Sequence, residues 1–250
     1  MTDFQGQTAV VTGAAQGIGR AIAEAFLERG ANVALCDLRI DKLESFAVQM
    51  AGKGAGQIFA RRVDLSRVSE ITDFVASVEA KFSAIDILVN NAGIHPLHPI
   101  LEISDEEWDQ VLAINLKAQF RLCKAVLPGM RRRKYGRIIN ISSEAGKNGG
   151  TVAAAHYSAS KGGVLAFTRN LAQQVGADGI TVNAVCPGRI ATEMSGAVSP
   201  EENQKFIDKS ILKRLGGPED IAFAVCYLAD RRAGFVTAET MNVNGGTLRD

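Results

Sequence analysis

The sequence predicts an α/β protein: a doubly wound parallel sheet of about seven strands, with helices on both faces, in a single domain. Short apolar runs alternate with longer segments that carry the helical period, and a glycine-rich turn joins the first run to the first helix. No linker or break in composition divides residues 1–250. Helices used as crossovers make neighbouring strands parallel and cover both faces of the sheet.

Each predicted strand is a short run of apolar or β-branched residues. In chain order these runs are 8–12, 32–37, 58–63, 85–90, 137–141, 180–186 and 240–244. Helices are predicted between them at 18–29, 42–50, 67–82, 105–130 and from about 151 onward. The stretch 189–215 stands outside this alternation. An insertion after the carboxyl end of a strand predicts a lid over the ligand site, with an ordinary pair of surface helices as the alternative.

Composition excludes several classes of function. Hydrophobic residues make up 46% of the chain and the net charge is +1, which gives no sign of a nucleic-acid partner or an anionic membrane surface. No apolar run approaches the ~18 residues of a membrane span, and the start lacks the pattern of a signal peptide, so we expect a cytoplasmic protein. The four cysteines are scattered without metal-ligand spacing, and no metal site is predicted.

The glycine-rich turn predicts a nucleotide site. Gly13, Gly17 and Gly19 follow the first strand and open the first helix, where a diphosphate can approach the backbone, as in Rossmann-type proteins. Asp37 closes the second strand, where a carboxylate can bind the ribose hydroxyls and repel a 2′-phosphate. NAD is therefore favoured over NADP, although Arg39 lies two residues away and keeps NADP as the alternative.

Tyr157 and Lys161 predict acid–base chemistry. Residues four apart share one face of a helix, so the ammonium is expected beside the phenol. A neighbouring positive charge lowers the pKa of a phenol from its usual ~10, which would let Tyr157 exchange a proton with a carbonyl or alcohol oxygen. A serine pair, Ser142 and Ser143, lies just upstream.

Together these residues resemble the short-chain dehydrogenase/reductase family, in its compact single-domain subgroup. The resemblance runs from about Thr8 to Gly246. Its motifs are Thr12-Gly13-x-x-x-Gly17-x-Gly19, Asn90-Asn91-Ala92-Gly93, Asn115, Ser143, Tyr157-x-x-x-Lys161 and Pro187-Gly188. One departure is Ala238-Glu239, which stands where related chains often have Gly-Gln and leaves the details of the last strand open.

The resemblance implies a catalytic role for four side chains. Tyr157 would be the acid or base, Ser143 would hold the substrate oxygen, and Lys161 would tune the phenol and bind the nicotinamide ribose. Asn115 would bend its helix and support a proton relay. Ser142 is the weaker serine candidate, because Ser143 has the family's spacing to the following glycine.

The resemblance also implies the residues that bind the cofactor and substrate. Those expected at the cofactor are Gly13, Gln16, Gly17, Ile18, Gly19, Asp37, Asp64, Leu65, Asn91, Ala92, Gly93, Tyr157, Lys161, Pro187, Gly188, Ile190 and Thr192. Those expected near the substrate are His95, Glu144, Asn148, His156 and Met194. His95 and His98 more often mark a surface loop than a metal site. Most relatives are tetramers, so a homotetramer is expected.

The predicted function is NAD-dependent interconversion of a secondary alcohol (a small alcohol, polyol or hydroxy-ketone) and its ketone. The alternative is reduction of 3-oxoacyl groups on acyl carrier protein or CoA. Asp178 counts against the carrier form, because a carboxylate there would repel an acidic carrier, whereas the run Arg131 to Lys134 could attract one. A non-enzymatic nucleotide-binding scaffold is the third possibility, disfavoured by the intact set of four catalytic residues.

Overall fold

A seven-stranded parallel sheet forms the centre of the molecule, with strand order β3-β2-β1-β4-β5-β6-β7. The structure is a computed structural model that describes residues 3–54, 56–150, 153–193 and 199–249. The strands are β1 (Thr8–Thr12), β2 (Asn32–Asp37), β3 (Ile58–Arg62), β4 (Ile87–Asn90), β5 (Gly136–Ile141), β6 (Ile180–Pro187) and β7 (Thr240–Val243). The predicted doubly wound fold is confirmed, and every predicted strand is present with ends that differ by two residues or fewer.

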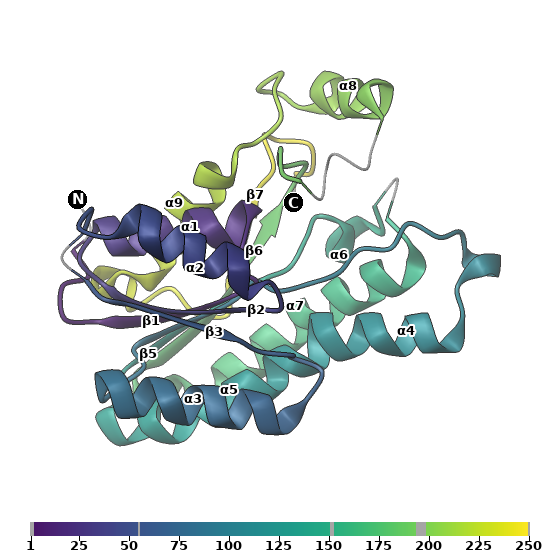
Figure 1. Cartoon of the computed structure of the whole chain (residues 1–250). Helices are drawn as coiled ribbons and strands as arrows, with labels where there is room; N and C mark the ends of the chain where they lie inside the picture. The colour runs from purple at the N-terminus through teal and green to yellow at the C-terminus, as the bar shows by residue number, and fades with distance from the viewer. Residues whose placement is uncertain (1–2, 55, 151–152, 194–198, 250) are drawn as a thin grey trace.

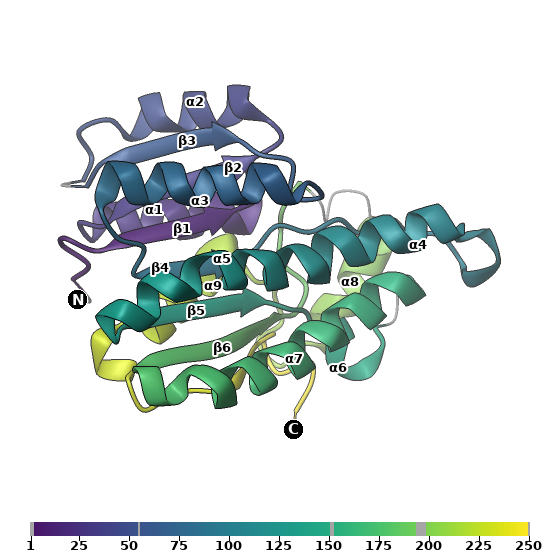
Figure 2. The ribbon, with the colours of Figure 1, turned by 90° about the horizontal axis from the view of Figure 1, so that it is seen from below.

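Helices cover both faces of the sheet (Figure 1). They are α1 (Gly17–Glu28), α2 (Ile40–Met50), α3 (Val68–Phe82), α4 (Asp105–Leu112), α5 (Ala118–Arg133), α6 (Ala145–Asn148), α7 (Ala155–Val175), α8 (Pro200–Lys209) and α9 (Pro218–Ala229). Helices α1, α2 and α9 contribute to one buried cluster, and α3, α5 and α7 to the other. Figure 2 shows the second group lying across the strands, with α4 projecting beyond the sheet.

Neighbouring residues of β1 face opposite layers of the core. Val11 packs in the cluster that contains Phe26 of α1, and Val10 packs in the cluster that contains Phe74 of α3. Both valines are fully buried. Because successive side chains of a strand point to opposite faces, a strand covered on both sides must be apolar throughout. This explains why β1 reads as a continuous apolar run.

The order of the strands places the ligand site. Strand β1 lies between β2 and β4. The chain moves outward from β1 through β2 to β3 and then returns to the other side of β1. In such sheets the crevice outside the carboxyl ends of the strands, at the point where the order reverses, receives the ligand.

The long helix predicted over 105–130 is interrupted. A turn of π-helix at Ala113–Lys117 separates α4 from α5, and α5 continues to Arg133. The buried Asn115 lies in this turn. Single π-helical turns inside α-helices are frequent at functional sites. Arg131, Arg132 and Arg133 form the last turn of α5, where cations complement the helix dipole.

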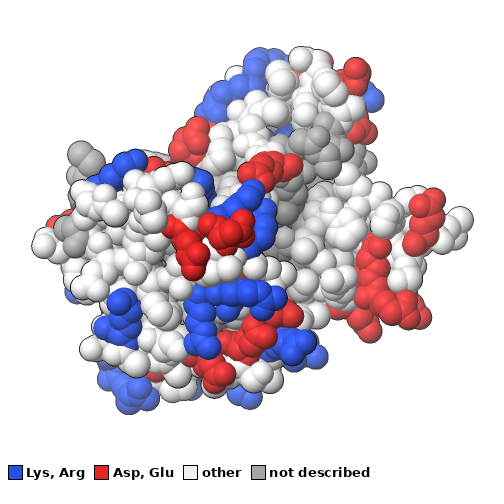
Figure 3. Space-filling view, viewed as in Figure 1, with Lys and Arg blue, Asp and Glu red and all other residues white. Residues whose placement is uncertain are grey.

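Charged side chains of both signs are interspersed on the face seen in Figure 3, in keeping with the net charge of +1. Carboxylates gather around α4, whose first turn holds Asp105, Glu106 and Glu107. Across the part of the chain that the structure describes, no helix combines the length and the apolar character needed to cross a bilayer. All four cysteines are buried with free thiols.

Candidate active site

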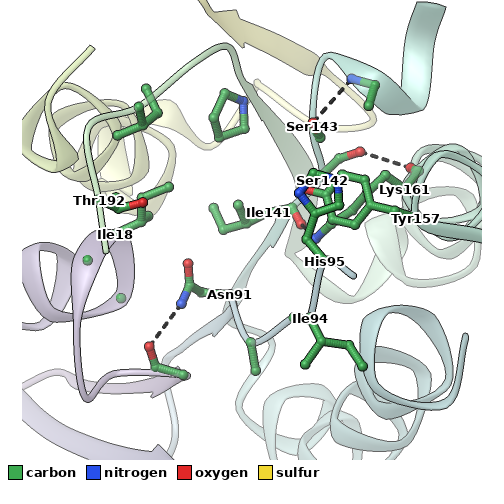
Figure 4. Close-up of a pocket in the computed structure, with 18 of the residues that line it drawn as sticks. Ile18, Asn91, Ile94, His95, Ile141, Ser142, Ser143, Tyr157, Lys161 and Thr192 are labelled. Atoms are coloured by element: carbon green, nitrogen blue, oxygen red, sulfur yellow. Dashed lines mark hydrogen bonds between the residues drawn. The ribbon is translucent and has the colours of Figure 1, made fainter. Parts of the chain in front are cut away.

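A cavity of about 920 Å³ runs along the carboxyl ends of the strands. Its wall includes Gly13, Asp37, Asn91, Ser143, Tyr157 and Pro187, so the nucleotide motif and the predicted catalytic residues share one space. Figure 4 shows how side chains from separate strands and helices surround it. The volume lies within the range of ~300–1,000 Å³ typical of sites for small molecules and cofactors.

The glycine turn lies very close to its surroundings. Gly13 has a φ of +65°, and a Cβ added there would lie 2.8 Å from the Cα of Ala92. Gly17 has a φ of +53° and opens α1, whose first turn contains no acidic residue. The free N–H groups of that turn are a suitable site for an anion. The turn thus has no room for a side chain at Gly13, and the N–H groups of the first turn of α1 suit a diphosphate.

Gly19 has a packing role that differs from the prediction. A Cβ added there would lie 2.2 Å from the carbonyl oxygen of Gly13, so the glycine lets α1 pack against the turn. Sequence spacing alone assigned it only to approach of the diphosphate. The neighbouring Asn91 holds the same turn, because its Nδ2 donates to the carbonyl oxygens of Thr12 (2.9 Å) and Gly13 (3.2 Å).

Asp37 lies at the opposite end of the cavity from Tyr157. Its Oδ2 accepts from the backbone N–H of Ala15 at 3.1 Å, and its Oδ1 accepts from the backbone N–H of Arg39 at 3.1 Å. The Arg39 guanidinium lies 3.5 Å from the same carboxylate and also hydrogen-bonds the side chain of Gln16. One carboxylate and one guanidinium therefore both face the region where a ribose would lie.

The other predicted cofactor residues surround the same space. Those on the cavity wall are Gln16, Ile18, Asp64, Leu65, Ala92, Gly93, Gly188, Ile190 and Thr192. The Asp64 Oδ1 accepts from the N–H and the hydroxyl of Ser66, and these bonds hold the pKa of Asp64 below its usual value. Thr192 faces Gly17, with its Cγ2 3.3 Å from the position of an added Cβ. The wall thus has the shape and the donors expected for an extended dinucleotide.

The two serines have different environments. The Ser142 Oγ donates to the carbonyl oxygen of Lys161 at 2.8 Å, and the residue is buried. Both serines line the cavity. Burial raises the pKa of the Tyr157 phenol, and a hydrogen bond to the Ser143 side chain partly offsets this. Because the Ser142 hydroxyl is bonded to the Lys161 carbonyl, Ser143 is the better placed of the two to share a substrate oxygen with Tyr157.

Tyr157 and Lys161 depart from the predicted arrangement. The Lys161 ammonium donates to the carbonyl oxygen of Ile141 at 2.8 Å and lies 5.7 Å from the centre of the Tyr157 ring. Burial raises the pKa of the Tyr157 phenol and lowers the pKa of Lys161 to about 8. The prediction that the adjacent cation lowers the pKa of Tyr157 is wrong for this structure, because removal of both groups from water dominates.

Asn115 joins the catalytic region to the end of β4. Its side chain accepts from the N–H of Ile94 at 2.9 Å and donates to the carbonyl oxygen of Ile94 at 3.0 Å. It also donates to the Ser160 hydroxyl at 3.1 Å. A Cβ added at Gly93 would lie 3.1 Å from the Asn115 Oδ1 and 3.5 Å from the Lys161 Nζ. Asn115 and Lys161 therefore both lie next to Gly93.

Three of the predicted substrate residues line the cavity: His95, Glu144 and Asn148. His95 lies in the loop after β4, and its ring lies against the Tyr157 ring, with centroids 3.9 Å apart (Figure 4). His98 is exposed and bonds Glu107 at 2.7 Å. Among the described residues, no group of three or more side chains is arranged to hold a metal ion.

The prediction for His156 is wrong. This residue is fully buried, its Nε2 lies 2.6 Å from Glu107 Oε1, and its Nδ1 accepts from the backbone N–H of Tyr157. It is not on the described wall of the cavity. Adjacent helical residues point about 100° apart, so a side chain next to Tyr157 faces α4 instead of the substrate. Met194 lies outside the described residues.

Several further wall residues were not singled out individually from the sequence. Among them are Arg189, Phe206 and Lys209, the last two from α8. The Arg189 Nε donates to Asn203 Oδ1 at 3.0 Å, and its guanidinium lies 5.5 Å from the Phe206 ring centre. The one signal in the sequence was their place within the predicted lid, 189–215. Short local patterns do not reveal which side chains such a segment turns inward.

With this geometry in view, comparison with known proteins identifies the family. The chain matches the model for short chain dehydrogenases over residues 7–203 and belongs to that family. It is an oxidoreductase that interconverts a hydroxyl and a keto group. The predicted resemblance is confirmed.

Among curated relatives, FabG of Escherichia coli (strain K12), a 3-oxoacyl-[acyl-carrier-protein] reductase, is 39% identical over 246 residues, 98% of each chain. FabG of Vibrio cholerae is 38% identical over 244 residues, again 98% of each. These relatives favour the alternative substrate class over the small alcohols of the leading prediction.

Two solved structures share the fold over almost its full length. A 3-oxoacyl-[acyl-carrier protein] reductase from Brucella melitensis is 37% identical, with a TM-score of 0.92 over 98% of this chain and 92% of that one. A putative gluconate dehydrogenase from Agrobacterium tumefaciens is 29% identical, with a TM-score of 0.93 over 99% and 98%. One backbone thus serves proteins named for different substrates.

Proposed function

We propose that this chain reduces the keto group of a 3-oxoacyl thioester to the corresponding secondary alcohol. The site geometry supports the reaction class, and the observation that carries the substrate class is the identity of 38–39% to named 3-oxoacyl reductases over nearly the whole of both chains. The leading prediction of a small alcohol, polyol or hydroxy-ketone becomes the second candidate.

In this proposal two side chains contact the substrate oxygen and two others support them. The cavity wall from Gly13 to Thr192 would hold a reduced nicotinamide cofactor, which would supply the hydride for the carbonyl carbon. Tyr157 gives its phenolic proton to the oxygen, while Ser143, which already hydrogen-bonds the phenol, holds that oxygen in place. The Lys161 ammonium stabilises the resulting phenolate, and its distance of 5.7 Å from the ring allows this through space. Asn115 positions Gly93 and Ile94 at the same wall.

We propose NAD as the cofactor. The Asp37 carboxylate lies where a ribose hydroxyl would bind, and it would repel a 2′-phosphate. Arg39 would favour NADP, since a guanidinium attracts the 2′-phosphate. The Asp37 carboxylate, 3.5 Å from the Arg39 Nε, partly neutralises that charge. Replacing Asp37 with Ser should shift the ratio of kcat/KM for NADH over NADPH about ten-fold or more towards NADPH. An unchanged ratio in Asp37→Ser would contradict this assignment.

The objection raised by Asp178 is weaker in the structure. Its carboxylate is paired with Lys134 Nζ at 2.5 Å and with Arg131 Nε at 2.9 Å. Asp178 precedes β6, so it lies at the amino end of the sheet, whereas the cavity lies at the carboxyl ends. A carrier or CoA that reaches this chain's own cavity from its mouth does not meet Asp178.

Within the second candidate class, the neighbour named as a putative gluconate dehydrogenase favours a polyol, and it adds a hydroxy-acid to that class. Arg189 and Lys209 place two cations on the cavity wall, and such groups suit a substrate carboxylate. The phosphates of CoA or of a carrier's phosphopantetheine arm would bind the same cations. The choice between the two substrate classes therefore needs a direct assay.

The deciding experiment measures NADH and NADPH oxidation with acetoacetyl-CoA, acetoacetyl-acyl carrier protein, gluconate-type keto acids and simple ketones. The proposal expects kcat/KM for a 3-oxoacyl thioester to exceed that for the keto acids at least ten-fold. A reversed order would replace it with the second candidate. If NADH binds tightly but none of these substrates is turned over, the non-enzymatic nucleotide-binding scaffold would be favoured.

We also propose a homotetramer and a lid formed by residues 189–215. The first is supported by exposed aromatic side chains on helices: Phe120 on α5 and Phe223 and Tyr227 on α9. The second is supported by Phe206 and Lys209, which bring α8 to the cavity wall. Light scattering in solution tests the first. The cytoplasmic location stays a prediction.

A further inference from the structure

His95 is a side chain on this wall to which the proposed reaction gives no role. It follows Ile94, whose N–H and carbonyl are both held by the side chain of Asn115. That pair of bonds fixes the backbone from which His95 projects. Its ring then lies against the Tyr157 ring at 3.9 Å with an interplanar angle of 30°. The imidazole is therefore held beside the proposed proton donor.

One nitrogen of this ring is unsatisfied. Among the residues that the structure describes, His95 Nε2 is buried and has no hydrogen-bond partner. A buried polar atom without a partner is costly, and such atoms in native proteins call for an explanation. Both His95 and Tyr157 line the cavity, so the imidazole forms part of the wall beside the phenol.

The imidazole acts in its neutral form. Burial, with the positive charges of Arg189 and Lys161 nearby, lowers the pKa of His95 to about 4. A neutral imidazole carries one N–H donor and one acceptor nitrogen. At neutral pH it suits an uncharged carbonyl better than a carboxylate, which would favour a charged imidazolium. Arg189 and Lys209 remain the cations for any anionic part of the ligand.

A 3-oxoacyl thioester presents two carbonyl oxygens with a single methylene between the carbonyl carbons. Both oxygens can therefore face one wall. We propose that His95 is a specificity-determining residue: its Nε2–H donates to the thioester carbonyl oxygen while Tyr157 and Ser143 hold the keto oxygen. This inference rests on the proposed function, and it explains how the site would distinguish a 3-oxoacyl thioester from a simple ketone of the same length.

The test compares two substrates in four proteins. The substrates are the N-acetylcysteamine thioester of acetoacetate and the ketone in which a methylene replaces its thioester carbonyl. The proteins are the wild type, His95→Phe, His95→Gln and the control His98→Phe. Phenylalanine keeps an aromatic ring on Tyr157 without a donor, and glutamine restores a donor without the ring. NADH titration and circular dichroism check that each variant folds and binds cofactor.

We expect His95→Phe to lower kcat/KM for the thioester about ten-fold or more, with little change for the ketone, and His95→Gln to recover most of the loss. His98→Phe should resemble the wild type. An equal loss on both substrates would show that His95 only orients Tyr157. Two results would overturn the His95 contact while leaving the proposed function in place. One is a kcat/KM for the thioester in His95→Gln that is no higher than in His95→Phe, and the other is no loss of kcat/KM in His95→Phe. A wild type inactive on the thioester would overturn the proposed function and this contact with it.

Discussion

The two ends of the cavity are built differently. At the nucleotide end, around Gly13, Gly19 and Asp37, the wall is mostly backbone, and its glycines lie in close contact with neighbouring main chain. At the substrate end, around Tyr157 and His95, the wall is made of side chains that are buried or stacked. Backbone contacts suit a ligand that is always the same, whereas side chains can change from one substrate to another without altering the fold.

The largest expected effect separates chemistry from cofactor binding. Removing the phenolic hydroxyl in Tyr157→Phe should lower kcat about a thousand-fold, since the variant lacks the proton donor. The Kd for NADH, measured by fluorescence titration, should change less than about three-fold, because the nucleotide end is untouched. Tyr227→Phe, at an exposed tyrosine of α9, is the matched control. Retention of turnover in Tyr157→Phe would remove this residue from the mechanism.

The second prediction concerns the nucleotide end. In Gly19→Ala the new Cβ would lie 2.2 Å from the carbonyl oxygen of Gly13, so the turn must shift. Strain of this kind costs about 1–3 kcal/mol, and we expect NADH to bind about ten-fold more weakly. Gly176→Ala has no atom within 4 Å of the new Cβ and serves as the control. Equal NADH affinity in the two variants would mean that the turn tolerates displacement.

The third prediction uses the pH dependence of stability at the substrate end. The pKa of His95 falls from 6.5 to about 4 on folding, chiefly through burial. Between those values the folded protein binds fewer protons than the unfolded chain, so this group lowers the free energy of unfolding as the pH drops from 6.5 towards 4. This destabilisation is fully present below the pKa of His95 in the folded protein and is absent well above its pKa in the unfolded chain.

Because His95 is only partly buried, we expect about 1–2 kcal/mol from this group, less than the full shift implies. Urea unfolding gives the free energy of unfolding of the wild type and of His95→Phe at pH ~7 and ~4.5. The contribution of His95 is the change, between the two pH values, in the difference between these free energies. The wild type should lose more stability than the variant on acidification. Parallel loss in both proteins would assign the acid sensitivity to other groups.

The smallest expected effect is at Ala238, which lies just before β7. Ala238 has a φ of +61°, a conformation that favours glycine. Ala238→Gly should therefore raise the free energy of unfolding by about 1 kcal/mol, measured in urea, with activity unchanged. Ala51→Gly, at a φ of −58°, should lower it slightly. A destabilised Ala238→Gly would mean that the methyl group contributes more through packing than its strain costs.

The sequence by itself predicted the seven strands, their parallel direction and the glycine-rich turn, and the family resemblance added Tyr157, Lys161 and Ser143 as the candidate catalytic set. These features depend on local rules, because apolar runs, glycine spacing and helical periodicity are written in consecutive residues. The positions of Asp37 and Asn91 followed from the same rules, since Asp37 ends β2 and Asn91 directly follows β4.

Only the tertiary structure decided features that depend on residues far apart in the chain. The helix over 105–130 breaks where Asn115 bonds the backbone of Ile94. Burial, which no local pattern measures, raises the pKa of Tyr157 where spacing to a lysine predicted the opposite. The direction of His156 and the stack of His95 on Tyr157 likewise depend on which helix or loop packs alongside. Local sequence sets each element, whereas desolvation and contact at the cavity arise only when the elements are assembled.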